Sequence, residues 1–314
     1  MDLSPLGAGT AGVWTRRQAD ALKLSDEQID HRVAAGEWQR VGRGVLADSG
    51  VVPDPLMRGW AAVQAGGGFG RAWAAGRTTA RMLDLPLIDD HDPATKAKDH
   101  VNDDVAVLAS RHPRHRATLH VQRLDLKAGD TVLLGGCPSL TLDRALPGLA
   151  GTLSFEALVC LLDAALHRGL IDLPRLHAVV EAQAGRRSCR VLRQAVALAD
   201  GRAEAPSETL ARLLLLPVLP GLEPQVQVFD HAMREVARFD LADRELKLAI
   251  EADGVRGHAG AQMVAKDKRR DRKTGRFGWM TERCTWWELR REQEALRARV
   301  VATAERLRRR RRPA

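Results

Sequence analysis

Cysteine is scarce in this sequence, and its spacing excludes two kinds of covalent support. The four cysteines, Cys137, Cys160, Cys189 and Cys284, lie far apart and form no CxxC pair. Three of them have apolar neighbours, and this pattern indicates neither a disulfide framework nor a zinc site. We therefore expect four reduced, mostly buried thiols in a cytoplasmic protein.

Other familiar signals are also absent. No apolar run reaches the roughly 18 residues that a membrane-spanning helix needs, and the N-terminus lacks the basic segment and apolar core of a signal peptide. The glycine-rich run at 66–70 is not followed by the Lys-Ser or Lys-Thr of a phosphate-binding loop, and no GxGxxG occurs. We expect neither a membrane partner nor a nucleotide cradle of these types.

The charge of the chain points to polyanions. The 314 residues include 49 Lys and Arg against 40 Asp and Glu, which gives a net charge of +9. Basic proteins attract nucleic acid through counterion release, and arginine suits bidentate phosphate contacts. The alternative is that arginine simply replaces lysine on solvated surfaces, and composition alone leaves the two equally open. The length favours two or three domains.

Residues 13 to 47 carry the signals of a DNA-binding helix-turn-helix. Two capping-box patterns follow one another, formed by Thr15 with Gln18 and by Ser25 with Gln28. They predict short helices at 16–22 and 26–35, separated by two residues, which is helix-turn-helix spacing. Alternating apolar and basic residues at 38–47, around Gly42 and Gly44, predict a β-hairpin wing. The candidate DNA contacts are Gln28, His31 and Arg32 on the second helix and Arg40 and Arg43 on the wing.

The middle of the chain, 51–200, is rich in alanine and leucine and has few groups arranged for chemistry. Its apolar periodicity predicts helices at 54–65, 74–83, 154–168, 173–182 and 188–198, and short strands at 105–108, 119–122 and 131–134. We therefore expect a mixed α/β connector. The residues 200–206 resemble a linker, so the predicted domains are 1–50, 51–200 and 201–314.

The whole chain is predicted to be an α+β protein of three parts, and its last domain a small α/β core. The pattern predicts a helix at 207–216, strands at 225–229, 236–241 and 246–252, a basic helix at 266–273, a strand at 279–284 and a final helix from Trp287. The run Arg308 to Arg312 is expected to form a frayed end that adds non-specific attraction to phosphates.

Carboxylates gather at one edge of this predicted sheet. Glu251 and Asp253 alternate onto the same face of one strand, and Asp240 ends the strand before it. Such oxygens are the ligands that Mg²⁺ or Mn²⁺ prefers, and phosphodiester hydrolysis needs a metal, a base and cations for the phosphate. His258 is the candidate base, and Lys266, Lys268, Arg269 and Arg270 are the candidate phosphate contacts.

These segments, taken in order, resemble the very-short-patch-repair endonuclease-like branch of the PD-(D/E)xK nuclease superfamily. The resemblance lies in SE at 207–208, RFDLA at 238–242, LAIEADG at 248–254, DKRRD at 267–271, GW at 278–279 and TWWEL at 285–289. It implies a restriction-endonuclease-like core in which Asp240 is the metal aspartate, Glu208 a helix-borne acid, Asp253 or Glu251 the second acid and His258 the general base. The superfamily's usual lysine is absent, since Asp253 stands in its place.

The front of the chain, through segments 12–19, 32–41 and 42–46, resembles the N-terminal winged helix of AbiEi-type antitoxins. That likeness implies DNA as a partner. Two functions stay open: a metal-dependent DNA endonuclease, or a transcriptional regulator of toxin-antitoxin type with a toxin-antitoxin or defence-system partner and a degenerate nuclease fold. Intact acids favour the first, and the missing lysine favours the second. Taken alone, each acid has a simpler reading, because Asp240 would suit a turn and Glu208 a helix start.

Overall fold

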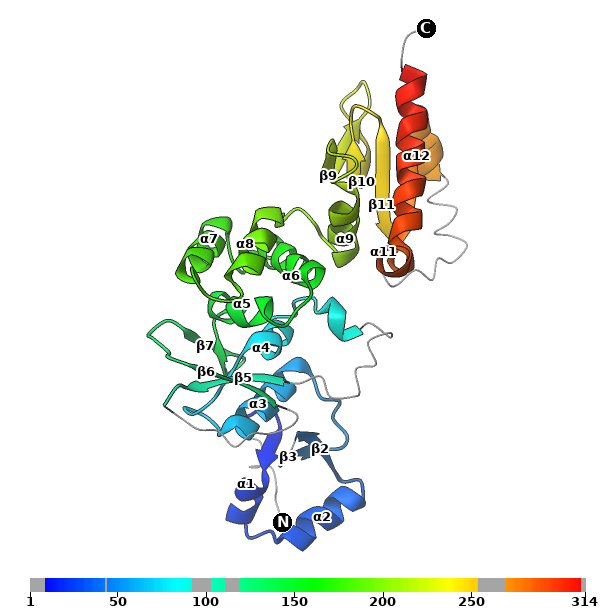
Figure 1. The fold of residues 1–314 in the computed structure, drawn as a ribbon. Helices are drawn as coiled ribbons and strands as arrows, with labels where there is room; N and C mark the ends of the chain where they lie inside the picture. The colour runs from blue at the N-terminus through cyan, green and yellow to red at the C-terminus, as the bar shows by residue number, and fades with distance from the viewer. Residues whose placement is uncertain (1–8, 43, 92–102, 111–118, 254–268, 312–314) are drawn as a thin grey trace. The chain divides into compact units, whose positions relative to one another are not determined.

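A computed structural model describes residues 9–42, 44–91, 103–110, 119–253 and 269–311 (Figure 1). It divides the chain into two units: unit 1 comprises Met1–Leu158 with Leu170–Ala197, and unit 2 comprises Val159–Gly169 with Leu198–Ala314. The fold is mixed α and β, with sheets of three and five strands in unit 1 and four strands in unit 2. In the described residues no helix is both long and apolar enough to cross a membrane.

Unit 1 opens with the two short helices and the hairpin that the capping boxes predict. Strand β1 (Val13–Thr15) is followed by α1 (Arg16–Ala21), α2 (Asp26–Ala34), β2 (Trp38–Gly42) and β3 (Val45–Asp48). Both capping boxes are present, so these local predictions are confirmed. The strands pair antiparallel in the order β1-β3-β2.

This segment does not have a core of its own. Trp14 and Trp38 meet edge to face at 5.1 Å, and both belong to one buried cluster with Trp60 of α3 (Pro55–Gly66) and with Cys137. A boundary at residue 50 would therefore cut through a shared hydrophobic core.

The rest of unit 1 is a five-stranded sheet with helices. Its strand order is β6-β5-β4-β8-β7, with β5–β6 and β4–β8 parallel and the other pairs antiparallel. The strands are β4 (Trp73–Ala74), β5 (Asp103–Leu108), β6 (Leu119–Leu124), β7 (Thr131–Leu134) and β8 (Cys137–Leu140). The helices are α4 (Gly76–Met82), a 3-10 turn η1 (Ile88–His91), α5 (Leu142–Ala150), α6 (Phe155–His167), α7 (Leu173–Ala182) and α8 (Cys189–Leu198), and the unit boundary falls inside α6. The sequence did not predict β4, β8 or α5.

Unit 2 contains the predicted series of elements. These are α9 (Pro206–Leu215), β9 (Leu222–Phe229), β10 (Glu235–Asp243), β11 (Leu248–Asp253), a helical segment at 269–275, β12 (Met280–Thr285), α11 (Trp286–Arg291) and α12 (Gln293–Arg311). The sheet order is β12-β11-β10-β9; β9, β10 and β11 run antiparallel, and β12 joins β11 in parallel.

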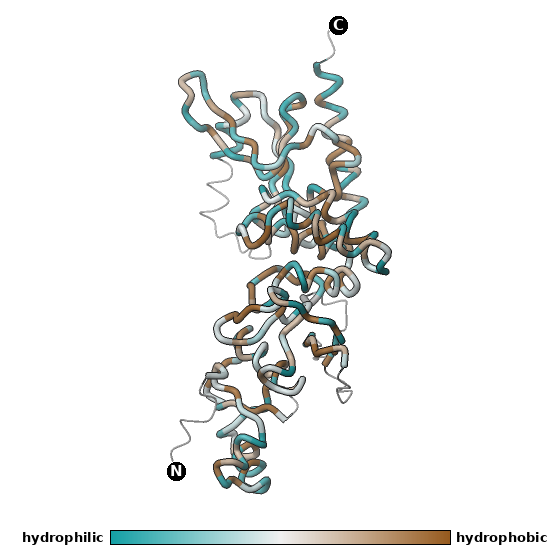
Figure 2. The backbone as a smooth tube through the Cα atoms, turned by 90° about the vertical axis from the view of Figure 1, so that its left-hand side faces the viewer, coloured by the Kyte–Doolittle hydropathy of each residue, from teal (hydrophilic) through white to brown (hydrophobic). Residues whose placement is uncertain are grey.

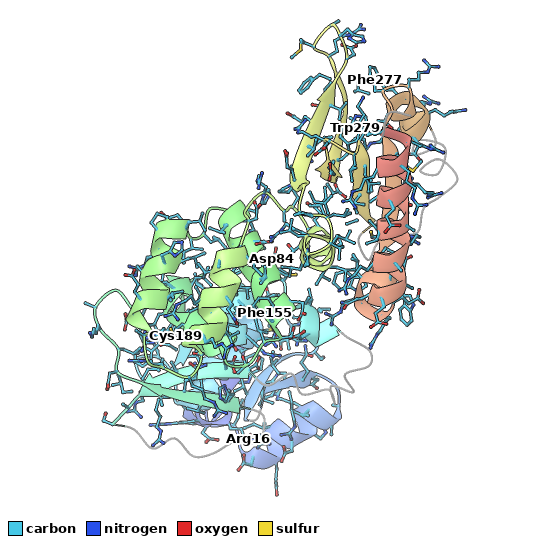
Figure 3. All side chains as sticks on the ribbon, turned by 45° about the horizontal axis from the view of Figure 1, so that its top comes forward. Arg16, Asp84, Phe155, Cys189, Phe277 and Trp279 are labelled. Atoms are coloured by element: carbon cyan, nitrogen blue, oxygen red, sulfur yellow. The ribbon has the colours of Figure 1, made fainter. Side chains whose placement is uncertain are left out.

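Aromatic residues pack together in one hydrophobic cluster of this sheet. Phe239 is 1% exposed and lies 5.1 Å from Trp279, ring centre to ring centre, and Phe277 packs against the same cluster. Trp279 and Phe277 come from the segment just before β12 (Figure 3). Trp279 is thus partly buried and packs against the core of unit 2.

The basic end of the chain is one point on which the sequence prediction was wrong. Helix α12 continues through Arg311, so Arg308 to Arg311 form helical turns and not a frayed end. Figure 2 shows this end of the chain as hydrophilic. Arginine is a good helix former, and cations stabilise the C-terminal end of a helix through its dipole. Arg312 lies outside the described residues.

All four cysteines are unpaired and buried, which confirms the prediction that they are buried.

Inside unit 2, a buried ion pair joins α6 to α9. Arg212 donates to the Asp163 carboxylate at 2.8 Å, and the Thr209 hydroxyl donates to the same carboxylate at 2.7 Å. Asp163 is 1% exposed and Arg212 5%, so these partners fix the helix that carries Glu208.

Candidate functional site

The strand pairing of unit 2 brings four polar side chains into one row. The printed register places Val226 opposite Phe239 and Pro224 opposite Leu241, so Gln225 faces Asp240. Likewise, Leu241 opposite Ile250 brings Asp240 beside Glu251, and Glu251 pairs with Arg283 of β12. Residues opposite one another in a sheet point to the same face. We call this set the polar row: Gln225, Asp240, Glu251 and Arg283.

Helix α9 adds a buried acid beside the row. Glu208 is 8% exposed, and its Oε2 accepts hydrogen bonds from the Glu204 backbone N–H at 3.0 Å and from Nε2 of Gln225 at 2.8 Å. Burial, with a smaller contribution from the charge of Asp240, raises the pKa of Glu208 to about 7 against the opposing effect of its hydrogen bonds. Glu208 therefore titrates near neutral pH.

The two acids at the centre of the row influence each other in the same way. Burial raises the pKa of Glu251 to about 7, with the charge of Asp240 adding to the effect. Burial also raises the pKa of Asp240, although its Oδ2 accepts from the Ala252 backbone N–H at 2.9 Å. Neighbouring like charges in a poorly solvated place favour the protonated forms. The row therefore holds protons that free carboxylates would lose.

An arginine side chain, that of Arg270, already binds one acid of the polar row, Glu251. Arg270 donates from both terminal nitrogens to both oxygens of Glu251, at 3.1 and 2.8 Å. It also donates to the backbone carbonyl of Arg238, and its guanidinium lies 5.5 Å from the ring centre of Phe239. Bidentate, partly buried pairs of this kind are the stronger ion pairs of proteins. The residue predicted to contact phosphate thus binds a candidate metal ligand instead.

Neighbouring arginines are paired as well. Arg283 makes a bidentate pair with Asp271 at 2.8 and 3.0 Å, and Arg238 pairs with Glu204 at 2.8 Å. Asp253 is exposed at the end of β11, and Arg269 is exposed at the start of the helical segment. His258, Lys266 and Lys268 lie outside the described residues.

The donor set has the right chemistry for a hard divalent cation, but its arrangement does not fit one. Carboxylate oxygens are what Mg²⁺ and Mn²⁺ prefer, and Oε1 of Gln225 is a further buried oxygen without a hydrogen-bond partner in the protein. Within the part of the chain that the structure describes, however, no three acidic, histidine or cysteine side chains are close enough together to hold a metal ion. Both oxygens of Glu251 are bound to Arg270. In the described arrangement the cation bound to Glu251 is therefore Arg270.

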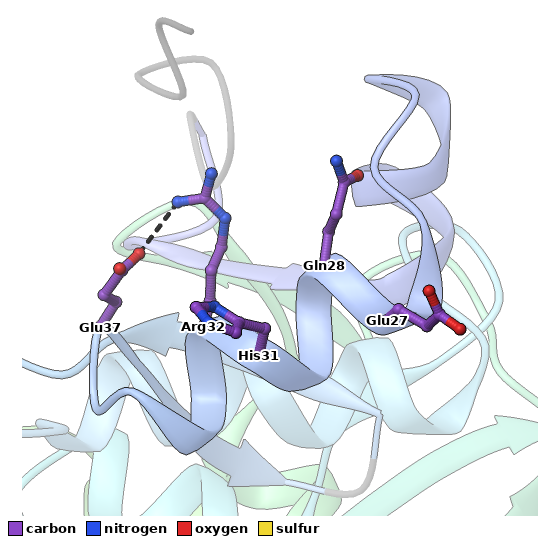
Figure 4. A pocket seen from close by; sticks show the side chains of 5 residues that line it. All are labelled: Glu27, Gln28, His31, Arg32 and Glu37. Atoms are coloured by element: carbon purple, nitrogen blue, oxygen red, sulfur yellow. Dashed lines mark hydrogen bonds and ion pairs between the residues drawn. The ribbon is translucent and has the colours of Figure 1, made fainter.

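Acidic side chains lie among the candidate DNA contacts of the N-terminal surface. A pocket of about 470 Å³ is lined by Glu27, Gln28, His31, Arg32 and Glu37 (Figure 4). Arg32 pairs with Glu37 at 3.0 Å, and its guanidinium lies 5.2 Å from the ring centre of Trp38.

Other polar groups of this surface also have local partners. Arg40 pairs with Asp30 at 3.4 Å, and the Gln28 side chain accepts from the Ser25 backbone N–H at 2.9 Å within the capping box. Exposed ion pairs contribute only about 0 to 1 kcal/mol, so a phosphate could replace the acid partner. Arg43 lies outside the described residues.

The sequence predicted the acids of the polar row but not the side chains that bind them. It did not foresee that Gln225 binds Glu208, because this needs the positive φ of 54° that turns Gln225 within β9. Nor did it foresee the pairing of Arg270 with Glu251, since the two residues are far apart in sequence. Arginine in a basic helix carries no local signal of its partner.

Comparison with known proteins gives no functional name. No protein-family model matches the chain. The uncharacterized proteins MT2308 and Rv2248 of Mycobacterium tuberculosis, from strains CDC 1551 / Oshkosh and ATCC 25618 / H37Rv, are each 34% identical over 148 residues. The match covers 47% of this chain and 54% of each relative, so the chain spans about half the length of the curated relatives it matches.

Proposed function

We propose that this chain is a DNA-binding protein whose unit 2 is a nuclease-type domain. One observation carries the proposal: Asp240 and Glu251 lie side by side on one sheet face with Glu208 facing them from α9, and the pKa of each is raised. Buried acids with shifted pKa values are concentrated at functional sites. The order helix, three strands, helix, strand, helix supports a PD-(D/E)xK type of core.

The row supplies part of the chemistry of phosphodiester cleavage. A carboxylate whose pKa lies near 7 can accept a proton from water at neutral pH, and Glu208 and Glu251 have that property. The reaction would also need a cation at the phosphate, and the proposal predicts Mg²⁺ or Mn²⁺ for this role. Because Arg270 holds Glu251 in the described arrangement, we derive no metal-bound step from it. His258 stays a predicted general base.

DNA binding is proposed for the N-terminal helices and hairpin, as a winged helix. Their described arginines would exchange carboxylate partners for phosphates, which is favourable where counterions are released from DNA. Arg32 and Arg40 are the described residues in question. The acidic side chains of this surface predict weaker non-specific binding than an unpaired basic helix would give.

A second candidate is a transcriptional regulator whose nuclease-type fold serves only for binding, acting with a toxin-antitoxin or defence-system partner. The bidentate pair of Arg270 with Glu251 favours it, because an internal cation already neutralises the row. Asp253 in the position of a catalytic lysine favours it too.

A plasmid-nicking assay with Mg²⁺ and Mn²⁺, run beside duplex binding by fluorescence anisotropy, separates the two. The variants are Asp240→Asn and Glu251→Gln, with Glu223→Gln as the matched control, since Glu223 lies on the same sheet and also pairs with an arginine, Arg244, at 3.2 Å. Cleavage that is lost in the first two variants and kept in the control supports the nuclease. DNA binding without cleavage would favour the transcriptional regulator. The absence of both binding and cleavage would contradict both functions.

A further inference from the structure

Unit 1 contains a cavity that the sequence did not indicate. It has a volume of about 630 Å³ and lies between β6, α5 and the turn that leads into α8. Cys189, labelled in Figure 3, is the first residue of that helix. Cavities of roughly 300 to 1,000 Å³ are typical of small-molecule sites. The cavity belongs wholly to unit 1.

The charge of its lining is of one sign. Three of the described lining residues are arginines, Arg144, Arg186 and Arg187, and none of the described lining residues is an acid. Arg144 is held in place by Asp130, at 3.2 Å, and by the backbone carbonyl of Asp125, at 3.4 Å. Arg186 and Arg187 are exposed and form no ion pair with any described residue. Two of the three guanidinium groups are therefore available for an anion.

A buried donor in the same wall is also unsatisfied. Nε2 of Gln122 is buried and has no hydrogen-bond partner in the protein. The amide lies against Gly148 of α5, where a Cβ would come within 2.6 Å of this nitrogen and make the Gln122 side chain shift. A buried amide without a partner destabilises the fold. A rotation of the Gln122 side chain toward the cavity that it lines would bring the amide to an acceptor oxygen of a ligand and satisfy it.

The start of α8 adds to the positive character. The Ser188 carbonyl accepts from the Leu192 backbone N–H, which sets Ser188 at the N-terminus of the ten-residue helix. The helix dipole favours an anion at this end. The apolar part of the lining comes from Leu124, Pro147 and Val191.

We propose that this cavity binds a phosphate-bearing small molecule of about nucleotide size. Arg186 and Arg187 would hold the phosphate, because guanidinium groups match phosphate oxygens in bidentate geometry. The Gln122 amide would donate to a further oxygen, and the apolar wall would contact the remainder of the molecule. A volume of about 630 Å³ is large enough for one such molecule. This inference is independent of the nuclease proposal.

Isothermal calorimetry on the full chain with ATP, AMP and inorganic pyrophosphate, without divalent ions, tests the proposal. The double variant Arg186→Gln/Arg187→Gln should weaken ATP binding by about tenfold or more, equal to about 1.4 kcal/mol. Arg190→Gln is the matched control, since Arg190 is exposed in the first turn of α8, close after Arg186 and Arg187 in sequence, but does not line the cavity. It should leave the affinity within about twofold.

Gln122→Leu provides a second readout. If the amide serves a ligand, this variant weakens ATP binding while its melting temperature without ATP stays level or rises, because an unsatisfied buried donor has been removed. The proposal is overturned if none of the three probes binds at millimolar concentration, or if Arg190→Gln weakens binding as much as the double variant. It is also overturned if duplex DNA displaces ATP and the double variant loses DNA binding to the same extent.

Discussion

Replacing Glu208 by glutamine measures the electrostatics of the polar row. The pKa of Glu208 is raised from 4.5 to about 7, a difference of about 2.5 units, and each unit corresponds to 1.36 kcal/mol. The protonated carboxyl is therefore favoured in the folded state by about 3 kcal/mol. This contribution to stability is fully present below about pH 4.5 and is lost as pH rises through about 7.

Glutamine imitates the protonated carboxyl. Its carbonyl oxygen can accept from the Glu204 N–H and from Gln225, as Oε2 of Glu208 does now. We expect Glu208→Gln to match the parent protein in stability near pH 4.5 and to exceed it by about 3 kcal/mol near pH 8. For a unit of this size the gain corresponds to roughly 10 °C in melting temperature.

Differential scanning calorimetry from pH 4.5 to 8 measures the difference. Glu235→Gln on β10 is the control, because Glu235 is exposed and should leave the pH dependence of the parent unchanged. Parallel curves for the parent and Glu208→Gln across the whole range would refute the assignment of a raised pKa to Glu208.

Four further variants test other parts of the structure. Arg270→Gln removes the internal cation of the row and should tighten Mn²⁺ binding in calorimetry by about tenfold; unchanged affinity would show that this arginine does not exclude the metal. Arg212→Met should lower the free energy of unfolding in urea by about 3 to 5 kcal/mol, because it leaves a buried carboxylate without its partner; a loss below 1 kcal/mol would contradict that role. Arg32→Ala with Arg43→Ala should weaken duplex binding and flatten its salt dependence, and an unaltered slope would count against a winged helix. Deleting 307–314 should reduce affinity equally for unrelated DNA sequences, whereas a loss confined to one sequence would point to base readout.

Local signals predicted the fold better than they predicted contacts. The capping boxes of α1 and α2 consist of residues three apart, so the sequence alone determines where these helices start. Alternation likewise identified β11 and its acids. By contrast, β4 has two residues and exists only because β5 and β8 flank it. Helix α5 contains Pro147, which lowers its apparent helix propensity.

In the polar row, too, local sequence patterns predicted the residues but not their long-range contacts. Its acids were predictable because strand alternation is local, but their charge state depends on how deeply the sheet is covered. The partner of Glu251 comes from Arg270, beyond the end of β11, and that of Glu208 comes from Gln225 on β9. Contacts of this range require the assembled fold, since no periodicity in the chain encodes them.

The four buried thiols allow the opening of each unit to be followed by chemical labelling. Cys137 and Cys189 belong to unit 1, and Cys160 and Cys284 belong to unit 2. Cys137 and Cys284 are fully buried, and burial raises the pKa of each to about 12. Because a thiolate is the reactive species, a maleimide reaches these sulfurs only when the surrounding unit opens. Labelling followed by peptide mass analysis would thus time the opening of the two units separately within one intact chain.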